Sequence, residues 1–383
     1  MSPATIHLII VELLYIHTYV ELIHKIYIDE NSDYYQKYDE SFYDNINITY
    51  LSENEMDEKK KHLVKPYNVF ESHLHRKEIF KTESFTYLYL DIHHIISDGT
   101  SHKLLLKQII DTYNDININL PKDYYFIFVD NFEKIQNSKE YIDAINKYQE
   151  NYDLIKDDCS LIITPDFNSD DENGASYNGE LNVDKNFNGN IVAKEFGGNV
   201  FFMCTYLISA CIYDNKKNSY LTWVHSGRDT KEKNNSIGAY IKSAPLFGKI
   251  DENTNLLDFY KNVKEQINFS LANSEVVYYP SDLKKLTHQS VFIYQYNIFN
   301  LYNAKEILNY EIINDDNNGA DSLFEFSLVD EDSRNNFGFE IEYSRDHYKK
   351  ESIEKFVKIF NDVALKLLKV EDASSFKIKQ LLQ

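Results

Sequence analysis

The sequence predicts an α/β protein, because segments with strand-like and helix-like patterns alternate along its whole length. Residues 324–328 and 337–343 alternate apolar with other side chains on either side of a polar stretch, which predicts a β-hairpin. Apolar residues at helical spacing through residues 353–368 then predict an amphipathic helix. With 383 residues, 43% of them hydrophobic, the chain can bury a large core and form two domains of ordinary size.

Two adjacent histidines, His93 and His94, end a strand-like run in the first half of the chain. Residues 85–92 are mostly aromatic or branched with few charges, which predicts a strand buried on both faces. Successive strand residues point to opposite faces. One histidine is therefore expected to face the interior and the other a cleft, unless the strand ends in a bulge.

A turn and a helix are predicted directly after the histidines. Ser97, Asp98 and Gly99 are turn-forming, and apolar residues recur at helical spacing through residues 100–113. Ser97 or Asp98 can cap the start of this helix. A helix N-terminus carries unpaired N–H groups and a partial positive charge, and both suit an oxyanion.

The histidines have two other interpretations. A histidine pair on a strand is most often structural. His93, His94, Asp98 and His102 lie close in sequence and could instead hold a metal, but zinc ligands usually follow a more regular spacing or include cysteines. We therefore expect no metal at these residues.

The string His-His-x-x-x-Asp-Gly at residues 93–99 resembles the signature of the condensation domains of nonribosomal peptide synthetases, which belong to the chloramphenicol-acetyltransferase-like superfamily. The order of later segments is similar as well. Residues 226–228 resemble the family's Gly-Arg segment, and residues 237–246 resemble its Ile-Gly-x-Phe-Val-Asn-Thr-x-Pro-Leu segment. Residues 294–295 resemble the Tyr-Gln pair that ends a later strand.

The chain also departs from that family. Residues 6–23 resemble the apolar helix before its first arginine motif, but they contain no arginine, and the family's first strand is absent. Lys242 stands where the family has asparagine, and Val276 and Val277 stand where it has His-Gln. The resemblance therefore implies a condensation domain that is truncated at its N-terminus or has diverged.

The fold that the resemblance implies is a pseudo-dimer of two chloramphenicol-acetyltransferase-like lobes, each an α+β sandwich. The two lobes would form a V shape with a tunnel between them. Residues 1–165 would form an incomplete N-terminal lobe that carries the histidine motif, and residues 166–383 would form the C-terminal lobe. The polar, turn-rich stretch 165–174 is the candidate boundary.

The implied reaction is amide-bond formation, in which a carrier-bound amine attacks the thioester of a carrier-bound acyl or aminoacyl donor. By position, His94 lies where the amine meets the donor carbonyl, and it either accepts a proton or orients the amine. His93 completes the catalytic motif, and N–H groups around Gly99 could hold the oxyanion. Asp98 is expected to pair with an arginine and to fix the turn.

The same resemblance assigns supporting roles to other residues. Because the family's usual arginine partners are missing, Arg228 is the preferred structural partner of Asp98, ahead of Arg345. Four residues are expected to contact substrate, and they are Ser97, Tyr240, Ser243 and Tyr294.

The implied partners are donor and acceptor peptidyl carrier proteins and an adjacent adenylation domain, in secondary-metabolite biosynthesis. No cofactor is expected to bind directly, since substrates would arrive on the 4'-phosphopantetheine of the carrier proteins. Two alternatives stay open: a catalytically inactive remnant that binds or recruits carrier proteins, and a related acyltransferase that uses acyl-CoA. An epimerisation domain would carry a glutamate before the Gly-Arg segment, and residues 223–228 contain none.

Composition limits the remaining classes. The net charge of −21, from 40 basic and 61 acidic residues, argues against nucleic-acid binding. The three cysteines have no ligand or redox spacing and indicate reduced thiols in a cytoplasmic protein. The apolar residues 6–16 include Glu12 and lack a basic leader, so neither a signal peptide nor a membrane span is expected.

Overall fold

The computed structural model shows alternating helices and strands, which confirms the α/β class. Its described residues fall into two compact units: unit 1 spans 1–131, 228–241 and 301–315, and unit 2 spans 132–227, 242–300 and 316–383. The predicted division into lobes after residue 165, the V shape and the tunnel stay predictions. The structure describes residues 24–30, 34–38, 48–70, 72–113, 116, 124–171, 173–184, 191–251, 253–276, 279–296, 322–331 and 335–381.

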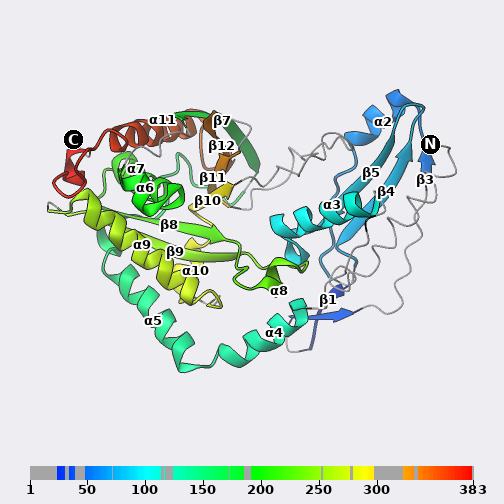
Figure 1. Ribbon diagram of the computed structural model, residues 1–383, viewed down its shortest axis with the longest axis horizontal. Helices are drawn as coiled ribbons and strands as arrows, with labels where there is room; N and C mark the ends of the chain where they lie inside the picture. Colours follow the sequence, from blue (N-terminus) through cyan, green and yellow to red (C-terminus); the bar gives the residue numbers. More distant parts are fainter. Residues whose placement is uncertain are drawn as a thin grey trace. The chain divides into compact units, whose positions relative to one another are not determined.

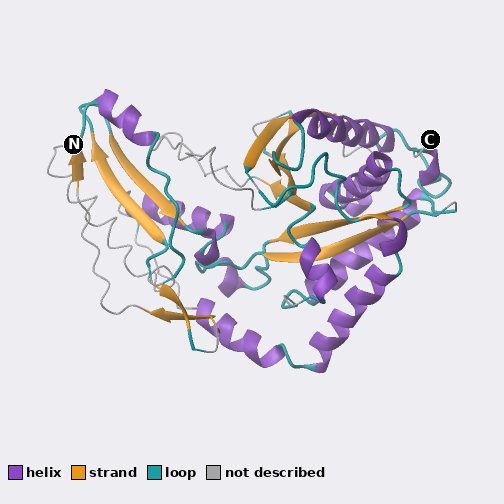
Figure 2. Ribbon diagram, turned by 180° about the vertical axis from the view of Figure 1, so that it is seen from behind, coloured by secondary structure: helices purple, strands orange, loops and turns teal. Residues whose placement is uncertain are grey.

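Unit 1 is built on a three-stranded sheet of order β3-β4-β5, in which β3 is parallel to β4 and β4 is antiparallel to β5. Figure 2 shows β4 and β5 as long neighbouring arrows. A separate hairpin joins β1 and β2. The elements are β1 (His24–Ile28), β2 (Tyr34–Tyr38), β3 (Ile48–Tyr50), α2 (Glu53–Lys60), β4 (His75–Lys81), β5 (Thr86–Ile92), the 3-10 turn η3 (His94–Ile96), α3 (Gly99–Tyr113), the first part of α4 (Tyr124–Ile135) and α8 (Lys231–Asn234).

Strand β5 lies where the sequence predicted a strand, but it is not buried on both faces throughout. Tyr89 is buried in a cluster with residues of α2, and Leu90 packs against the cluster around α3 on the other face. The α2 cluster extends to Tyr87, but the opposite face is open near the start of the strand, where Leu88 is 37% exposed; Phe85, just before the strand, is 59% exposed. Among the described strands β5 pairs only with β4, so it is an edge strand here.

Helix α3 confirms the helix predicted for residues 100–113. Its buried side chains Leu105 and Ile109 pack with Ile96 of the 3-10 turn and with Ile237. Ile237 belongs to residues 228–241, a segment that we call the Arg228 loop. Apolar packing thus holds this distant segment against α3, in addition to the polar contacts described below.

Unit 2 is organised around a mixed seven-stranded sheet of order β6-β8-β10-β11-β12-β7, with β9 paired to β8. Strands β6, β8, β10 and β11 run parallel, whereas β9, β12 and β7 form antiparallel pairs. The elements are the end of α4, α5 (Lys139–Asp153), η4 (Lys156–Asp158), β6 (Cys159–Ser160), β7 (Gly174–Asp184), α6 (Ile191–Phe196), α7 (Gly198–Asp214), β8 (Asn218–His225), β9 (Lys242–Lys249), α9 (Leu256–Ala272), α10 (Ser281–Leu286), β10 (Val291–Tyr296), β11 (Phe324–Asp330), β12 (Asn336–Ser344), α11 (Lys350–Leu367) and η7 (Ile378–Gln380).

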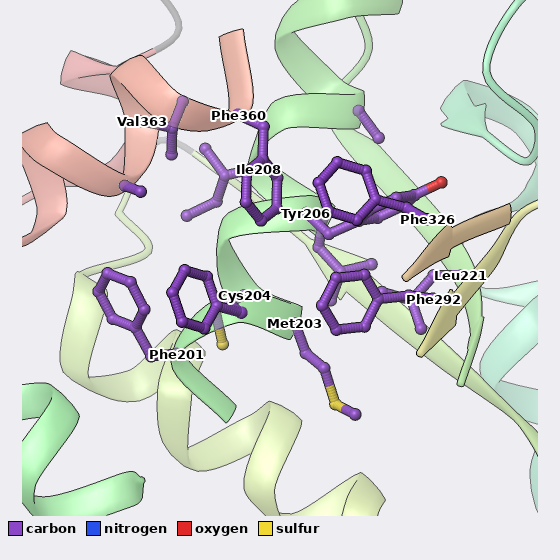
Figure 3. Packing of buried hydrophobic residues seen from close by; sticks show 14 of the residues in the cluster. Phe201, Met203, Cys204, Tyr206, Ile208, Leu221, Phe292, Phe326, Phe360 and Val363 are labelled. Atoms are coloured by element: carbon purple, nitrogen blue, oxygen red, sulfur yellow. The ribbon is translucent and has the colours of Figure 1, made fainter. Parts of the chain in front are cut away.

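Helix α7 forms the centre of the unit 2 core, packed on β8 with α11 and α9 beside it (Figure 1). It is apolar on all sides, which is typical of a helix that lies wholly inside a protein. Figure 3 shows Tyr206 of α7 among Phe292, Phe326 and Phe360, side chains from two strands and α11. All four of these residues are fully buried. Helix α5 covers the other side of β8, where Tyr220 packs in a second cluster.

Several predictions for unit 2 are confirmed. Strands β11 and β12 form the predicted hairpin, with Phe326 opposite Ile341, and α11 is the predicted amphipathic helix. The described part of the stretch 165–174 is loop up to the start of β7. The predicted helix at residues 6–23 lies outside the described residues.

The cysteines and the helices bear on two further expectations. Cys159, Cys204 and Cys211 are free thiols, and burial raises the pKa of the Cys211 thiol to about 12. A thiol with a raised pKa is rarely ionised and reacts slowly. In the part of the chain that the structure describes, no helix combines the length and hydropathy needed to cross a bilayer.

We expect Phe326→Ala to lower the free energy of unfolding by about 3–5 kcal/mol, because it leaves a cavity in the packed core. The Phe326 ring lies 4.6 Å, centroid to centroid, from the ring of Phe360. Urea denaturation followed by circular dichroism measures the change. Phe167→Ala, at a side chain that is 46% exposed, is the control and should cost under about 1 kcal/mol. Equal losses for the two variants would contradict this packing.

Candidate functional site

The histidine motif lies on a short 3-10 turn that follows the strand, and not on the strand itself. Strand β5 ends at Ile92, and His93 caps η3 with extended backbone angles. The N–H of His93 donates to the carbonyl of Leu74 at 2.8 Å, which holds the turn to the neighbouring chain. The expectation that the two histidines occupy opposite strand faces is therefore wrong, because strand alternation ends before them.

Hydrogen bonds to the turn's own backbone hold the two imidazoles in opposite tautomers. The Nδ1 of His93 accepts the N–H of Ile95 at 3.1 Å, so this nitrogen carries no proton. The Nδ1 of His94 lies 2.7 Å from the carbonyl oxygen of Ser97, which can only accept, so this nitrogen carries the proton. In neutral His94 the lone pair is therefore at Nε2. His94 is exposed, and among the described residues none bonds to Nε2.

Asp98 is buried at the start of α3, where it caps the helix as predicted. Its Oδ1 accepts the N–H of Ser101 at 2.8 Å and lies 2.9 Å from the Ser101 hydroxyl. Its Oδ2 accepts the N–H of Tyr240 at 3.1 Å. One carboxylate thus binds both the first turn of α3 and the Arg228 loop.

Arg228 completes the coordination of Asp98. Its Nε donates to Oδ2 at 3.1 Å and its Nη2 donates to Oδ1 at 2.8 Å, a bidentate pair in which both side chains are 1% exposed. Its Nη1 donates to the carbonyls of Ser236, at 2.8 Å, and of Lys233. The guanidinium also lies over the ring of Tyr240, with Cζ 4.4 Å from the ring centroid. Arg345 is exposed and belongs to unit 2.

Ser101 is a buried residue that connects α3 to the Arg228 loop, and it was not among the site residues predicted from the sequence. Its Oγ accepts from the Nη2 of Arg228 at 2.8 Å and from the N–H of Gly238 at 3.0 Å. Its single hydroxyl proton is shared between Asp98 Oδ1 and the carbonyl of Gly238, both at 2.9 Å. Such a fully satisfied buried network favours one conformation over others. A serine three residues after an aspartate is the sequence signal that could have indicated it.

A second group of residues supports the turn from the side of β4. Its arginine, Arg76, was not among the site residues predicted from the sequence. Arg76 pairs with Asp91 at 2.9 Å and donates to the carbonyls of Lys65 and Pro66. Its guanidinium lies 3.7 Å from the ring centroid of Tyr67, and the rings of Tyr67 and His93 pack in a T-shaped arrangement with their centroids 5.6 Å apart. Tyr67 donates to the carbonyl of Asp91 at 2.9 Å, and burial raises the pKa of Tyr67.

His102, in the first turn of α3, contacts the same motif. Its Nε2 lies 3.1 Å from the Oγ of Ser97, which is fully buried. His102 is exposed as a residue, but partial removal of its ring from solvent lowers its pKa, the charge on His94 lowers the pKa further, and Asp98 opposes these effects. His102 is therefore neutral at pH 7.

The residues predicted to contact substrate are divided between the units. In unit 1, Ser97 and Tyr240 are fully buried, and the hydroxyl of Tyr240 bonds to Ser236 at 2.6 Å. In unit 2, the carbonyl of Ser243 accepts a hydrogen bond from Tyr279, and Tyr294 donates to Asp330 at 2.6 Å. Their substrate-binding roles stay predictions.

Lys242 replaces the family's asparagine at the start of β9, where its side chain is 10% exposed and lies 3.8 Å from Glu275. Its Nζ is also 5.8 Å from the ring centroid of Phe132. Of the valine pair that differs from the family, Val276 is buried, whereas Val277 lies outside the described residues.

The geometry around His94 suits proton transfer next to a helix N-terminus. The N–H of Ser101 is taken by Asp98 Oδ1 and that of His102 by the Asp98 carbonyl. In the described chain, no protein acceptor meets the N–H groups of Gly99 and Thr100. Across the same residues, no three side chains of His, Cys, Asp or Glu gather as a metal site would require.

Comparison with known families identifies the class. The family model described as "Condensation domain" matches residues 16–379. The chain therefore belongs to the condensation domain family. A curated relative, bacitracin synthase 1 of Bacillus licheniformis, is 25% identical over 274 residues, which make up 68% of this chain. The match spans only 5% of that synthase.

Solved structures share the fold at low sequence identity. The epimerization domain from the third module of tyrocidine synthetase B has a TM-score of 0.70 at 14% identity, covering 96% of this chain and 90% of that one. The first condensation domain of the calcium-dependent antibiotic synthetase, with a substrate analogue, has 0.68 at 14%, covering 98% and 90%. A four-domain nonribosomal peptide synthetase bound to AMP and glycine has 0.71 at 13%, covering 97% and 31%.

We expect Arg228→Met to lower the free energy of unfolding by about 3–5 kcal/mol, since it leaves the buried Asp98 carboxylate without its cation. The Arg228 loop should also become sensitive to protease, because four of its residues contact the guanidinium. Urea denaturation and limited proteolysis measure the two effects. Arg345→Met, at an exposed arginine, is the matched control. Similar stability for both variants would show that the pair is unimportant.

We expect the stability of the protein to fall with acidification because of His102. A histidine with a lowered pKa in the folded state binds protons less readily than the unfolded chain, whose histidines titrate near ~6.5. The free energy of unfolding should therefore drop below that pH, and His102→Gln should reduce the drop. Denaturation at pH 7.5 and 5.5 tests this, with exposed His62→Gln as control. The same pH dependence in His102→Gln as in the parent would refute it.

Proposed function

We propose that this chain is a condensation domain that forms an amide bond between a carrier-bound donor thioester and a carrier-bound acceptor amine. The observation that carries the proposal is the exposed His94, whose Nδ1 is engaged by the Ser97 carbonyl, so that the lone pair of the neutral ring is at Nε2. Membership of the condensation domain family supports the reaction class. Both histidines of the motif are present, and no glutamate precedes Arg228 as it would in an epimerisation domain.

In the proposed step the acceptor amine attacks the thioester carbonyl, the C–N bond forms and the C–S bond breaks. The attacking nitrogen loses one proton, and the departing sulfur gains one. In this proposal Nε2 of His94 accepts the first proton and returns it to the thiolate. An α-amino group has a pKa near ~7.7–8.0, so a fraction of the acceptor amines is already neutral at physiological pH. For these amines, His94 would need only to orient the nitrogen for attack.

The oxyanion that forms at the carbonyl carbon needs donors. The N–H groups of Gly99 and Thr100 at the start of α3 supply candidates, since the other two N–H groups of that turn are engaged by Asp98. A preorganised donor of this kind often contributes about 3–4 kcal/mol to the transition state. Asp98 and Arg228 would then act through position alone, because both are buried in their mutual ion pair.

The partners in this proposal are donor and acceptor peptidyl carrier proteins and an adenylation domain on the same assembly line. The 4'-phosphopantetheine arm of each carrier would bring the substrates, and no cofactor would bind to the chain itself. The similarity to part of a four-domain nonribosomal peptide synthetase supports this setting. The family's carrier proteins are usually acidic, and this chain has a net charge of −21. Because like charges repel, carriers would dock through local apolar or basic patches.

We expect His94→Ala to slow amide formation about 10²–10⁴-fold, the usual contribution of a general base. Purified carrier proteins loaded with donor and acceptor aminoacyl groups, with product release followed by mass spectrometry, measure the rate. Exposed His62→Ala is the matched control and should keep the parent rate.

The outcomes of that assay separate the alternatives. Parent-like turnover by His94→Ala would overturn the catalytic role of His94. Carrier binding without turnover by the unmodified chain would favour a recruitment module. Turnover with acyl-CoA but not with carrier-bound donors would indicate a free-standing acyltransferase.

A further inference from the structure

His102 is a histidine of the α3 first turn that the motif does not include and the proposed reaction does not use. Its backbone N–H donates to the carbonyl of Asp98 at 3.0 Å, so the residue is fixed at the start of the helix. Its ring turns back toward the 3-10 turn, with Nε2 at 3.1 Å from the Ser97 hydroxyl. Among the described residues, it is thus the one side chain outside residues 93–98 with a hydrogen bond to the Ser97 hydroxyl.

Ser97 connects His102 to His94. The Ser97 carbonyl accepts the Nδ1 proton of His94 at 2.7 Å, and the Ser97 hydroxyl bonds to His102. The other contact of that hydroxyl is the carbonyl of His93 at 3.4 Å, a longer and weaker bond. The Ser97 N–H donates to the His94 carbonyl at 3.3 Å, so the backbone alone holds this residue loosely.

The protonation state and the tautomer of His102 together set the direction of the bond. In the neutral ring, Nε2 either accepts the Ser97 hydroxyl proton or, when it carries the ring proton, donates to the hydroxyl oxygen, and either bond holds the hydroxyl. In a protonated His102, Nε2 could only donate, and the hydroxyl proton would turn to the His93 carbonyl. The charged groups that act on His102 are His94, which disfavours protonation, and Asp98, which favours it.

We propose that His102 is a positioning residue for His94. By holding the Ser97 hydroxyl, it fixes the carbonyl that keeps the proton on Nδ1 of His94, so that the lone pair stays on Nε2 of this exposed residue. This inference rests on the proposed function only for its effect on rate. The tautomer of His94 can be observed whether or not the chain catalyses.

The test compares His102→Leu with His102→Gln in the full chain. Glutamine can place its amide group near the position of Nε2 and bond to the Ser97 hydroxyl as acceptor or donor, whereas leucine cannot. Ring ¹⁵N spectra of histidine-labelled protein report the tautomer, and the signals of His94 are assigned by their loss in His94→Gln. We expect the Nδ1–H form in the parent and in His102→Gln, and a mixture of both tautomers in His102→Leu.

Two further measurements accompany the spectra. Ser97→Ala removes the hydroxyl from the other side and should give the same mixture as His102→Leu. In the carrier-protein assay, His102→Leu should lower kcat about fivefold with KM unchanged, the effect of one lost hydrogen bond. His102→Gln should restore most of the rate.

The outcomes are distinguishable. An unchanged His94 tautomer in both His102→Leu and Ser97→Ala would overturn the inference, as would a glutamine variant that behaves like the leucine variant. Tautomer changes in a chain that forms no amide would leave the inference standing and would count against the proposed function.

Discussion

The buried ion pair between Asp98 and Arg228 is the constraint on which the histidine motif depends. Two charges that are 99% removed from solvent are tolerable only because every polar group around them has a partner. Asp98 caps α3, accepts from the Arg228 loop and ends the turn that carries the histidines. A change at either member of the pair therefore alters helix, loop and turn together, although neither side chain is placed to touch a reacting group.

Backbone carbonyls and N–H groups, more than other side chains, fix the tautomers of the two histidine rings. Adjacent histidines would ordinarily exchange tautomers freely, yet here one ring nitrogen meets an N–H and the other meets a carbonyl. The turn thus distinguishes two identical side chains by their position alone. Arg76 and Tyr67 add rigidity on the β4 side, where a stacked guanidinium holds an extended segment beside His93.

Much of this could be predicted from the sequence where local periodicity decides the outcome. Helix α3, the β11–β12 hairpin and α11 follow their apolar patterns because burial on one face is all that each requires. The exposure of Leu88 could not be predicted, since it depends on how far α3 extends over one face of β5. The opposite-face expectation for His93 and His94 failed because a 3-10 turn begins one residue after the strand.

The candidate site was predictable only in part, for a similar reason. Asp98 and Arg228 were paired by their resemblance to family motifs, and the structure brings them together. Ser101 and His102 give no strong signal, because their roles depend on contacts with Gly238 and Ser97 that spacing alone does not reveal. Catalytic and substrate-binding roles within the site stay predictions, since they concern molecules that bind to it.

The order of the chain has a consequence for protein synthesis. Arg228 lies 130 residues after Asp98, so at about 5–20 residues per second the ribosome delivers it roughly ten seconds later. Until then the Asp98 carboxylate must stay hydrated, because burying it alone would be too unfavourable. Unit 1 therefore cannot reach its final state until residues 132–227, which belong to unit 2, have emerged. Unit 1, whose synthesis begins first, therefore stays incompletely folded and exposed to chaperones and proteases in the meantime.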